Sequence, residues 1–356
     1  MARGQTFGSE RRWLRDPHTG TKVWQLTGYH CHSTKLSYST QSWTPDGAWI
    51  VFFSELRWGR DAPLGLFKVR GDGGVIVQLS DTPVADPFAC IDWPRRRVVF
   101  VSGDEVRTVG LDDFREEVLV RFPGASAFGG MTMRPDGRAA LTTFTEGNVC
   151  KLVRIGLEDG VATTIFAEPD RFGRAQYCFD GTGTIRFSGG RFAARPDIAE
   201  PQGIWVIEED GSDLRAPVPR DGWREITHDT WRGTSREVIF IQANRLQITE
   251  RYPSTIEAVD VDTGALRIVA RRGSYWHCCA SPDGTRIISD TNWPQRGLVL
   301  IDVATGREQI LCWPGESGGA PAWGHPHPSF SPDGRRVLYN SDPHGISQLF
   351  VALVEE

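Results

Sequence analysis

No apolar stretch in this sequence of 356 residues approaches the roughly 20 residues that a membrane-spanning helix needs. The first residues, MARGQTFGSERR, also lack the apolar core of a secretory signal peptide. Basic residues are not in excess, since 40 Lys and Arg stand against 45 Asp and Glu and the formal net charge is −5. A nucleic-acid binder would be expected to carry a basic stripe. These absences predict a soluble, cytoplasmic protein with neither a membrane nor a nucleic-acid partner.

Paired cysteine motifs are also missing. The seven cysteines form no CxxC pair, which argues against a zinc ribbon and predicts reduced thiols. Adjacent Cys278 and Cys279 point to opposite faces of a predicted strand, so a dithiol redox site is not expected there. The cysteines are Cys31, Cys90, Cys150, Cys178, Cys278, Cys279 and Cys312. Abundant instead are 39 Gly, 22 Pro and 13 Trp, a composition that favours a turn-rich β protein.

A turn motif recurs about every 50 residues. Its four clearest copies read Pro-Asp-Gly before an apolar strand, and three degenerate copies fill the gaps. Pro presets one φ angle and Gly accepts a positive φ, so each copy predicts a tight turn. Equivalent points of the seven copies are Pro45, Pro94, Pro135, Phe179, Gly233, Pro282 and Pro332. Their spacings of 49, 41, 44, 54, 49 and 50 residues predict an all-β, seven-bladed β-propeller.

The two ends of the chain carry complementary parts of one blade. The turn sequence DPHTG and the strand after it, residues 16–26, precede the first blade, whereas the last blade stops at SQLFVALVEE without an outer strand. We expect residues 12–28, approximately, to complete blade seven and remove an exposed sheet edge. No linker interrupts the pattern, so residues 1–356 are predicted to form a single domain. The Gly- and Pro-rich stretch 188–202 is predicted to be a loop of blade four, either functional or a plain insertion.

Repeat register gathers basic side chains at one height of the propeller channel. The inner-strand positions five residues before the turn points are Thr40, Ala89, Gly130, Arg174, His228, His277 and His327. Four consecutive blades therefore carry a basic residue there, and we expect the four side chains to converge at one channel mouth. A single strand histidine is commonly structural, but four of the eight histidines gathered at one site, these three and nearby His325, are harder to explain in that way.

A metal site is the first chemical hypothesis for this cluster. His325 lies two residues before His327, on the same face of the strand, and prolines after each make the segment rigid. With His277 they offer three imidazoles to a divalent transition metal such as Mn, Fe, Ni, Cu or Zn. Arg174 and His228 lie on the neighbouring blades, where one could hold a carboxylate and the other could move a proton.

Several segments resemble one known family. They are GQTFGSE at 4–10, DPHTG at 16–20, QLT at 25–27, HDTW at 228–231 and HPHPSFSPDG at 325–334. Together they resemble the oligogalacturonate lyases over nearly the whole chain, and the last segment is the most specific.

The resemblance implies a cytoplasmic seven-bladed propeller that cleaves short oligogalacturonides by β-elimination, with Mn²⁺ in the channel mouth. By position, His277, His325 and His327 match metal ligands and His228 matches the Brønsted base. Arg174 is then predicted to hold the substrate carboxylate or stabilise the transition state, because an enolate-like state needs its charge neutralised.

The sequence departs from the family around the substrate. Where the family has a further metal ligand, Gln, three residues before the HPH segment, this chain has Ala322. Arg174 replaces a family histidine, and Gln202-Gly203 stands where the family's carboxylate-binding Arg would be. Besides Arg174, the residues predicted to bind the substrate are Gln176, Arg191 and Arg195.

We therefore predict a metal-dependent lyase acting on short uronate-containing saccharides, with galacturonate itself no longer assured. Two alternatives stay open: a noncatalytic, TolB-like binding propeller, and a metal-dependent hydrolase or epimerase of acidic sugars. The sequence does not predict the oligomeric state.

Overall fold

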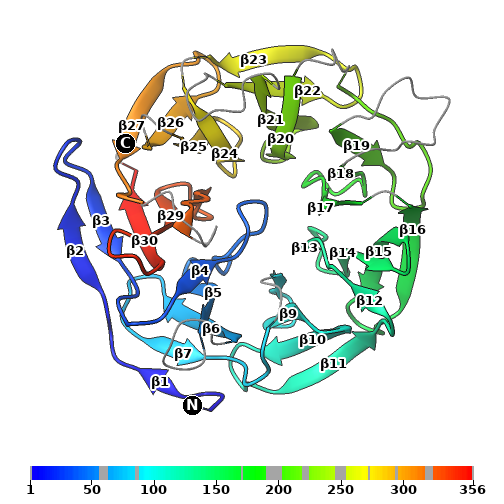
Figure 1. Cartoon of the computed structure of the whole chain (residues 1–356), viewed down its shortest axis with the longest axis horizontal. Coiled ribbons are helices and arrows are strands. Elements are labelled where there is room, and N and C mark those ends of the chain that lie inside the picture. Colours follow the sequence, from blue (N-terminus) through cyan, green and yellow to red (C-terminus); the bar gives the residue numbers. More distant parts are fainter. Residues whose placement is uncertain are drawn as a thin grey trace.

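In the computed structural model, seven β-sheets form a ring around a common centre (Figure 1). The structure describes residues 2–55, 63–84, 88–169, 171–189, 203–218, 224–244, 254–271, 273–292, 296–316 and 324–354. Neighbouring strands within a sheet run antiparallel. This arrangement confirms the predicted all-β, seven-bladed β-propeller.

From the inner strand outward, the first four blades are built as follows. Blade one has β4 (Ser33–Lys35), β5 (Trp49–Glu55), β6 (Leu64–Arg70) and β7 (Ile76–Gln78), with β1 (Thr6–Phe7) outside β7. Blade two has β8 (Ala89–Asp92), β9 (Arg97–Ser102), β10 (Glu105–Gly110) and β11 (Glu116–Arg121). Blade three has β13 (Met131–Met133), β14 (Ala139–Glu146), β15 (Val149–Gly156) and β16 (Ala162–Glu168), and β12 (Ala125–Ser126) also pairs with β14. Blade four has β17 (Phe172–Tyr177), β18 (Ile185–Gly189) and β19 (Ile204–Ile207).

The remaining three blades follow the same plan. Blade five has β20 (Arg224–Trp231), β21 (Glu237–Asn244), β22 (Thr255–Asp260) and β23 (Leu266–Ala270). Blade six has β24 (Tyr275–Ala280), β25 (Arg286–Thr291), β26 (Leu298–Asp302) and β27 (Glu308–Cys312). Blade seven has β28 (Ser329–Phe330), β29 (Arg336–Ser341), β30 (Gln348–Leu353), β3 (Lys22–Gln25) and β2 (Arg12–Arg15).

The N-terminal strands close the ring, as predicted. Strand β3 pairs with β30, placing Trp24 opposite Val351, and β2 adds a further strand outside β3. The Asp16 carboxylate accepts hydrogen bonds within its own turn and from the backbone N–H of Trp313 at 2.7 Å, just beyond β27. Strand β1 continues to the edge of blade one. The N-terminal segment therefore connects blades six, seven and one; a single domain over residues 1–356 stays a prediction.

The repeated turns owe their shape to their Asp and Gly residues. In each of the four clear copies the Asp carboxylate accepts a hydrogen bond from the backbone N–H two residues later, at 3.0 to 3.1 Å. The Gly that follows Asp has φ between 67° and 72°, a conformation that other residues adopt at a cost. The turns therefore fix where each second strand begins.

Adjacent blades pack face to face through apolar side chains. Val51 and Phe53 of β5 meet Val98 and Phe100 of β9, and all four side chains are fully buried. Alternation along each strand sends such residues into the interface between sheets, where burial stabilises the ring. Nowhere in the described ranges is there a helix long and apolar enough to cross a membrane.

Candidate metal and substrate site

Bulges and positive φ angles in the backbone orient the basic side chains of the cluster. Pairing register shifts in three inner strands, within residues 173–176 of β17, 227–230 of β20 and 275–278 of β24. These bulges contain Arg174, His228 and His277, and a bulge re-aims the side chains it carries. Arg174, His228 and His327 also have φ of 55°, 51° and 44°. Positive φ is uncommon outside glycine and is held only where the surrounding structure requires it.

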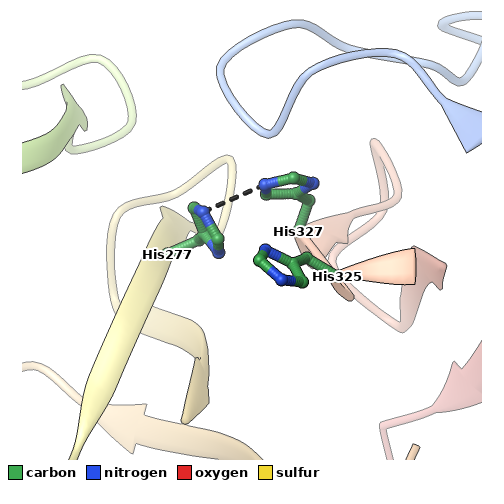
Figure 2. A group of neighbouring side chains, drawn as sticks. All are labelled: His277, His325 and His327. Carbon is green, nitrogen blue, oxygen red and sulfur yellow. Dashed lines mark hydrogen bonds between the residues drawn. The ribbon is translucent and has the colours of Figure 1, made fainter. Parts of the chain in front are cut away.

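Three histidines converge between blades six and seven (Figure 2). His277 comes from β24, and His325 and His327 come from the segment before β28. One nitrogen from each ring lies within 4.8 Å of the other two, and the Nε2 atoms of His277 and His327 are 2.9 Å apart. Two nitrogens bound side by side to one ion at about 2.1 Å would be about 3 Å apart. The spacing of these side chains therefore suits a common metal ion.

A buried carboxylate holds two of these residues in place. Asp290 of β25 is 3 % exposed; one of its oxygens lies 2.8 Å from Nδ1 of His277, and the other accepts the backbone N–H of the same residue at 2.6 Å. It also accepts the backbone N–H of His327 at 3.2 Å. A carboxylate on Nδ1 leaves Nε2 of His277 for a metal, the usual support of a metal-binding histidine. Burial raises the pKa of Asp290 to about 6.

Two of the histidines, His277 and His327, are held neutral. Burial, reinforced by the neighbouring His325 and Arg174, lowers the pKa of His277 well below its usual value. Burial and the proximity of His277 do the same to the pKa of His327. A neutral imidazole is the form that binds a metal, so the donor set fits a divalent transition metal. Sequence reasoning did not find Asp290, although an Asp inside the apolar strand IISDT was the available signal.

His228 lies beside the three histidines. Its ring centroid is 4.3 Å from that of His277, and its buried Nδ1 has no hydrogen-bond partner among the described residues. Burial, then the proximity of His277 and Arg174, lowers the pKa of His228 well below the usual value. The ring is therefore neutral at neutral pH and able to accept a proton.

Arg174 presents its guanidinium to the same space. The side chain is exposed, and no carboxylate of the described residues lies within ion-pair distance of it. Nearby Tyr38, followed by Asp229, raises the pKa of Arg174. Most of the described arginines are paired with a carboxylate, so a guanidinium that no described carboxylate pairs, beside neutral histidines, favours an anionic ligand.

Comparison with known proteins finds relatives in sequence and in fold. No protein-family model matches the chain. The oligogalacturonide lyase of Pectobacterium atrosepticum is 26% identical over 228 residues, and the oligogalacturonate lyase of Dickeya dadantii is 25% identical over 226. Each match covers 58% of this chain and 56% of the relative's length. A solved oligogalacturonate lyase in complex with manganese superposes over 100% of this chain and 99% of its own, with a TM-score of 0.88 and 20% identity.

The chain is a distant homologue of the oligogalacturonate lyases. The sequence resemblance is thereby confirmed at the level of distant homology, and the structural likeness extends the shared fold to the full length. The sequence matches span only about half the length of these curated relatives.

A loop of blade one contributes a site residue that was not predicted from the sequence. Residues 36–42 leave the sheet after β4 and reach toward the centre of the ring (Figure 1). Tyr38, 7 % exposed, places its ring centroid 5.5 Å from His277 and 6.1 Å from His228. The loop is held from across the ring: Thr40 donates to the Met131 carbonyl at 3.2 Å. The expectation that Thr40, Gly130 and His327 lie in inner strands is wrong. Thr40 lies in this loop, and Gly130 and His327 lie in the segments before β13 and β28.

Gln176 lies in the wall behind the site. Its side chain is 2 % exposed, donates to the Ser39 carbonyl at 2.9 Å and accepts from Arg186 at 2.9 Å. Arg186 in turn forms a buried ion pair with Asp229. These contacts show a structural role for Gln176, and its predicted contact with substrate stays a prediction.

Four further positions named from the sequence lie outside the described residues. They are Arg191, Arg195, Gln202 and Ala322. The predicted blade-four loop, apart from its first two residues, lies there as well.

Proposed function

We propose that this protein is a metal-dependent lyase that cleaves short uronate-containing saccharides by β-elimination. One observation carries the proposal: a neutral histidine, His228, lies between a three-histidine set and the Arg174 guanidinium, which no described carboxylate pairs. Removing a proton next to a carboxylate needs a base and a means of neutralising the carboxylate, and this site offers both. The distant homology supports the same reaction.

The ion is proposed to be Mn²⁺, held by His277, His325 and His327. The solved relative is a manganese complex, and an all-imidazole set accepts this ion among others. When bound, a divalent ion would draw negative charge from the uronate carboxylate and so acidify the neighbouring C5–H. Asp290 would keep two of the ligands oriented.

The chain's own residues would carry the remaining steps. Arg174 would pair with the uronate carboxylate and stabilise the charge that grows on it as the proton leaves. His228 would take the C5 proton. The C5–H electron pair becomes the C4–C5 double bond, and the glycosidic oxygen on C4 leaves with its bonding pair and is protonated by water. The products are a 4,5-unsaturated uronate and a shortened saccharide.

The proposal also covers setting and substrate. The substrates are proposed to be fragments of pectin or of another acidic polysaccharide, degraded in the cytoplasm. The predicted substrate residues Gln176, Arg191 and Arg195 remain part of this proposal.

The test is optical. Purified protein with Mn²⁺ is incubated with digalacturonate, trigalacturonate and disaccharides whose reducing-end glucuronate carries the glycosidic bond on O4, and the absorbance of the unsaturated product is followed. We expect turnover of at least one, and a loss of about 10²-fold or more in kcat for His228→Ala. Asp104→Ala, far from the cluster in the turn after β9, is the control. Reducing sugar without this absorbance would mean hydrolysis, and a changed sugar without cleavage would mean epimerisation. No reaction and no metal uptake would favour a noncatalytic binding propeller.

A further inference from the structure

One large apolar side chain faces the site from an inner strand. Trp276 of β24 is 36 % exposed. Every other exposed large apolar residue of the described ranges lies on an outer strand, in a turn or in a connecting segment. These are Trp13, Leu14, Tyr29, Val118, Val161, Phe179, Leu266 and Ile268. An exposed indole at the centre of the ring is typical of a ligand-binding surface.

The bulge in β24 places this indole beside the proposed base. Its neighbours Tyr275 and His277 are buried, at 1 % and 3 % exposed, while Trp276 remains open. The ring centroids of Trp276 and His228 are 5.1 Å apart, and the planes meet at 52°. Trp276 also meets His277 edge-on, with centroids 5.9 Å apart.

His228 is thus bounded by two aromatic rings of different exposure. Tyr38 packs against it edge-on at 6.1 Å and is almost fully buried, whereas Trp276 remains accessible. A ligand that reaches the base from solvent therefore meets the indole next to it. Arg174, coupled electrostatically to His228, offers the charged contact of the same ligand.

The chemistry of a pyranose fits an indole at this point. In a D-uronate chair, the C5 hydrogen is axial and shares its ring face with the hydrogen on C3; in the galacto configuration the C4 hydrogen points to that side as well. That face is apolar, and apolar C–H groups pack on the face of an aromatic ring with dispersion and weak C–H···π attraction. The face from which a base removes the C5 proton is therefore the face that an indole beside that base would cover.

We propose that Trp276 is a substrate-binding platform for the pyranose ring whose C5 proton His228 removes, and that it selects D-uronates presenting an apolar face there. This inference rests on the proposed function for the identity of the reaction. It assigns the recognition of the sugar ring to Trp276 and the recognition of its carboxylate to Arg174. Affinity then depends on the indole, while the chemical step does not.

Binding without turnover tests the platform. Chelator-treated protein is mixed with digalacturonate, and saturation-transfer NMR maps which sugar hydrogens contact the protein, with a titration for affinity. We expect the strongest transfer at H3, H4 and H5 of one ring. Trp276→Ala should bind about tenfold more weakly and lose this pattern, since aromatic stacking is worth roughly that much. Trp276→Phe should retain most of the affinity, and Trp13→Ala, an exposed Trp on β2, should bind as the wild type does.

Kinetics with Mn²⁺ separate this inference from the proposed function. If unsaturated product forms, Trp276→Ala should raise KM about tenfold with kcat changed far less. Equal KM in Trp276→Ala and wild type would overturn the platform while the lyase assignment stands. The expected NMR pattern without any unsaturated product would refute the lyase and keep the platform. The platform is also overturned if Trp276→Ala leaves digalacturonate binding unchanged. It is overturned as well if the wild type does not bind digalacturonate with or without Mn²⁺.

Discussion

At the scale of single residues, Asp290 contacts two of the proposed metal ligands. It engages the ring of His277 and the backbone of both His277 and His327, so one carboxylate fixes ligands that lie on two blades. Its own burial excludes water from these hydrogen bonds, which strengthens them. The ligand geometry therefore depends on a residue that itself binds no metal.

Asp290→Asn should weaken metal binding while leaving the fold intact. An amide keeps the shape of the side chain but offers one acceptor where the carboxylate offers two, so the His277 ring loses its fixed orientation. We expect Mn²⁺ affinity to fall about 10- to 100-fold, as measured by isothermal titration calorimetry. Asp104→Asn removes the same charge far from the cluster and should bind Mn²⁺ normally. Equal affinities in the two variants would contradict the role given to Asp290.

Lys35 predicts a pH dependence of stability. Burial lowers the pKa of this lysine to about 7, and its Nζ donates to the Leu36 carbonyl at 2.8 Å. Between pH 7 and the ordinary lysine pKa near 10.4, the unfolded chain binds a proton that the folded chain does not. The Lys35 contribution to the free energy of unfolding should therefore rise with pH in that window, by at most about 1.4 kcal/mol per pH unit.

The measurement compares wild type with Lys35→Met. Denaturant unfolding from pH 6 to pH 9.5 should give stabilities whose difference is flat below pH 7 and then grows in favour of the wild type. Lys22→Met, an exposed lysine on β3, should run parallel to the wild type. Parallel curves for Lys35→Met as well would show that Lys35 is charged in the folded protein.

At the scale of elements, two similar turns differ in what they connect. Asp302 bonds only within its own turn, accepting from the backbone N–H and the hydroxyl of Thr305. Asp16 does the same with Thr19 and adds the Trp313 backbone N–H through its second oxygen. The N-terminal turn is thus attached to blade six as well as to blade seven.

Asp16→Asn should remove the contact with Trp313 and leave the hydrogen bonds that Thr19 and Thr21 donate to the Leu311 carbonyl. The amide retains one oxygen for the local turn and presents N–H groups to the donor of Trp313, leaving a partly buried N–H unpaired. We expect a loss of about 1 to 3 kcal/mol in the free energy of unfolding, measured by denaturant titration. Asp302→Asn should change it by less than about 0.5 kcal/mol. Similar losses in both variants would indicate that the turns, and not the contact with Trp313, determine the effect.

Elements with a local signal were predictable from the sequence. The Pro-Asp-Gly turns fixed the blade count, and the Asp-x-x-Thr-Gly turn marked the closing strand. The loop at residues 36–42 was not predictable, because blade one keeps its turn at Pro45 while its inner strand ends early at Lys35. The bulges could not be predicted either. Two of them contain non-glycine residues with positive φ, Arg174 and His228, and packing by the surrounding structure, which leaves no local sequence pattern, holds these residues in that conformation.

At the scale of the whole molecule, the ring provides a rigid support for the site. The three histidines come from strands and a proline-flanked segment whose neighbours are buried in the sheets. Repeat register predicted their convergence because equivalent positions of a propeller lie at equal heights. It could not predict Asp290 or Tyr38, which stand at other positions of the repeat and reach the site only through the packing of side chains.

Metal removal should therefore leave the protein folded. Because the ligands stand on packed blades, chelation is expected to lower the melting temperature by a few degrees without abolishing the cooperative transition seen by calorimetry. Added Mn²⁺ should restore the melting temperature in proportion to the logarithm of its free concentration. His277→Ala combined with His327→Ala should abolish this response. Unfolding on chelation would mean that the metal, and not the ring, maintains the structure.

The closing contact of β3 with β30 has a consequence for synthesis. Trp24 pairs with Val351, so blade seven cannot be completed until β30 has left the ribosome. His325 and His327 belong to that blade. An emerging chain that stops short of β30 would therefore hold six blades and no finished site. The capacity to bind metal should appear only once β30 has emerged and paired with β3.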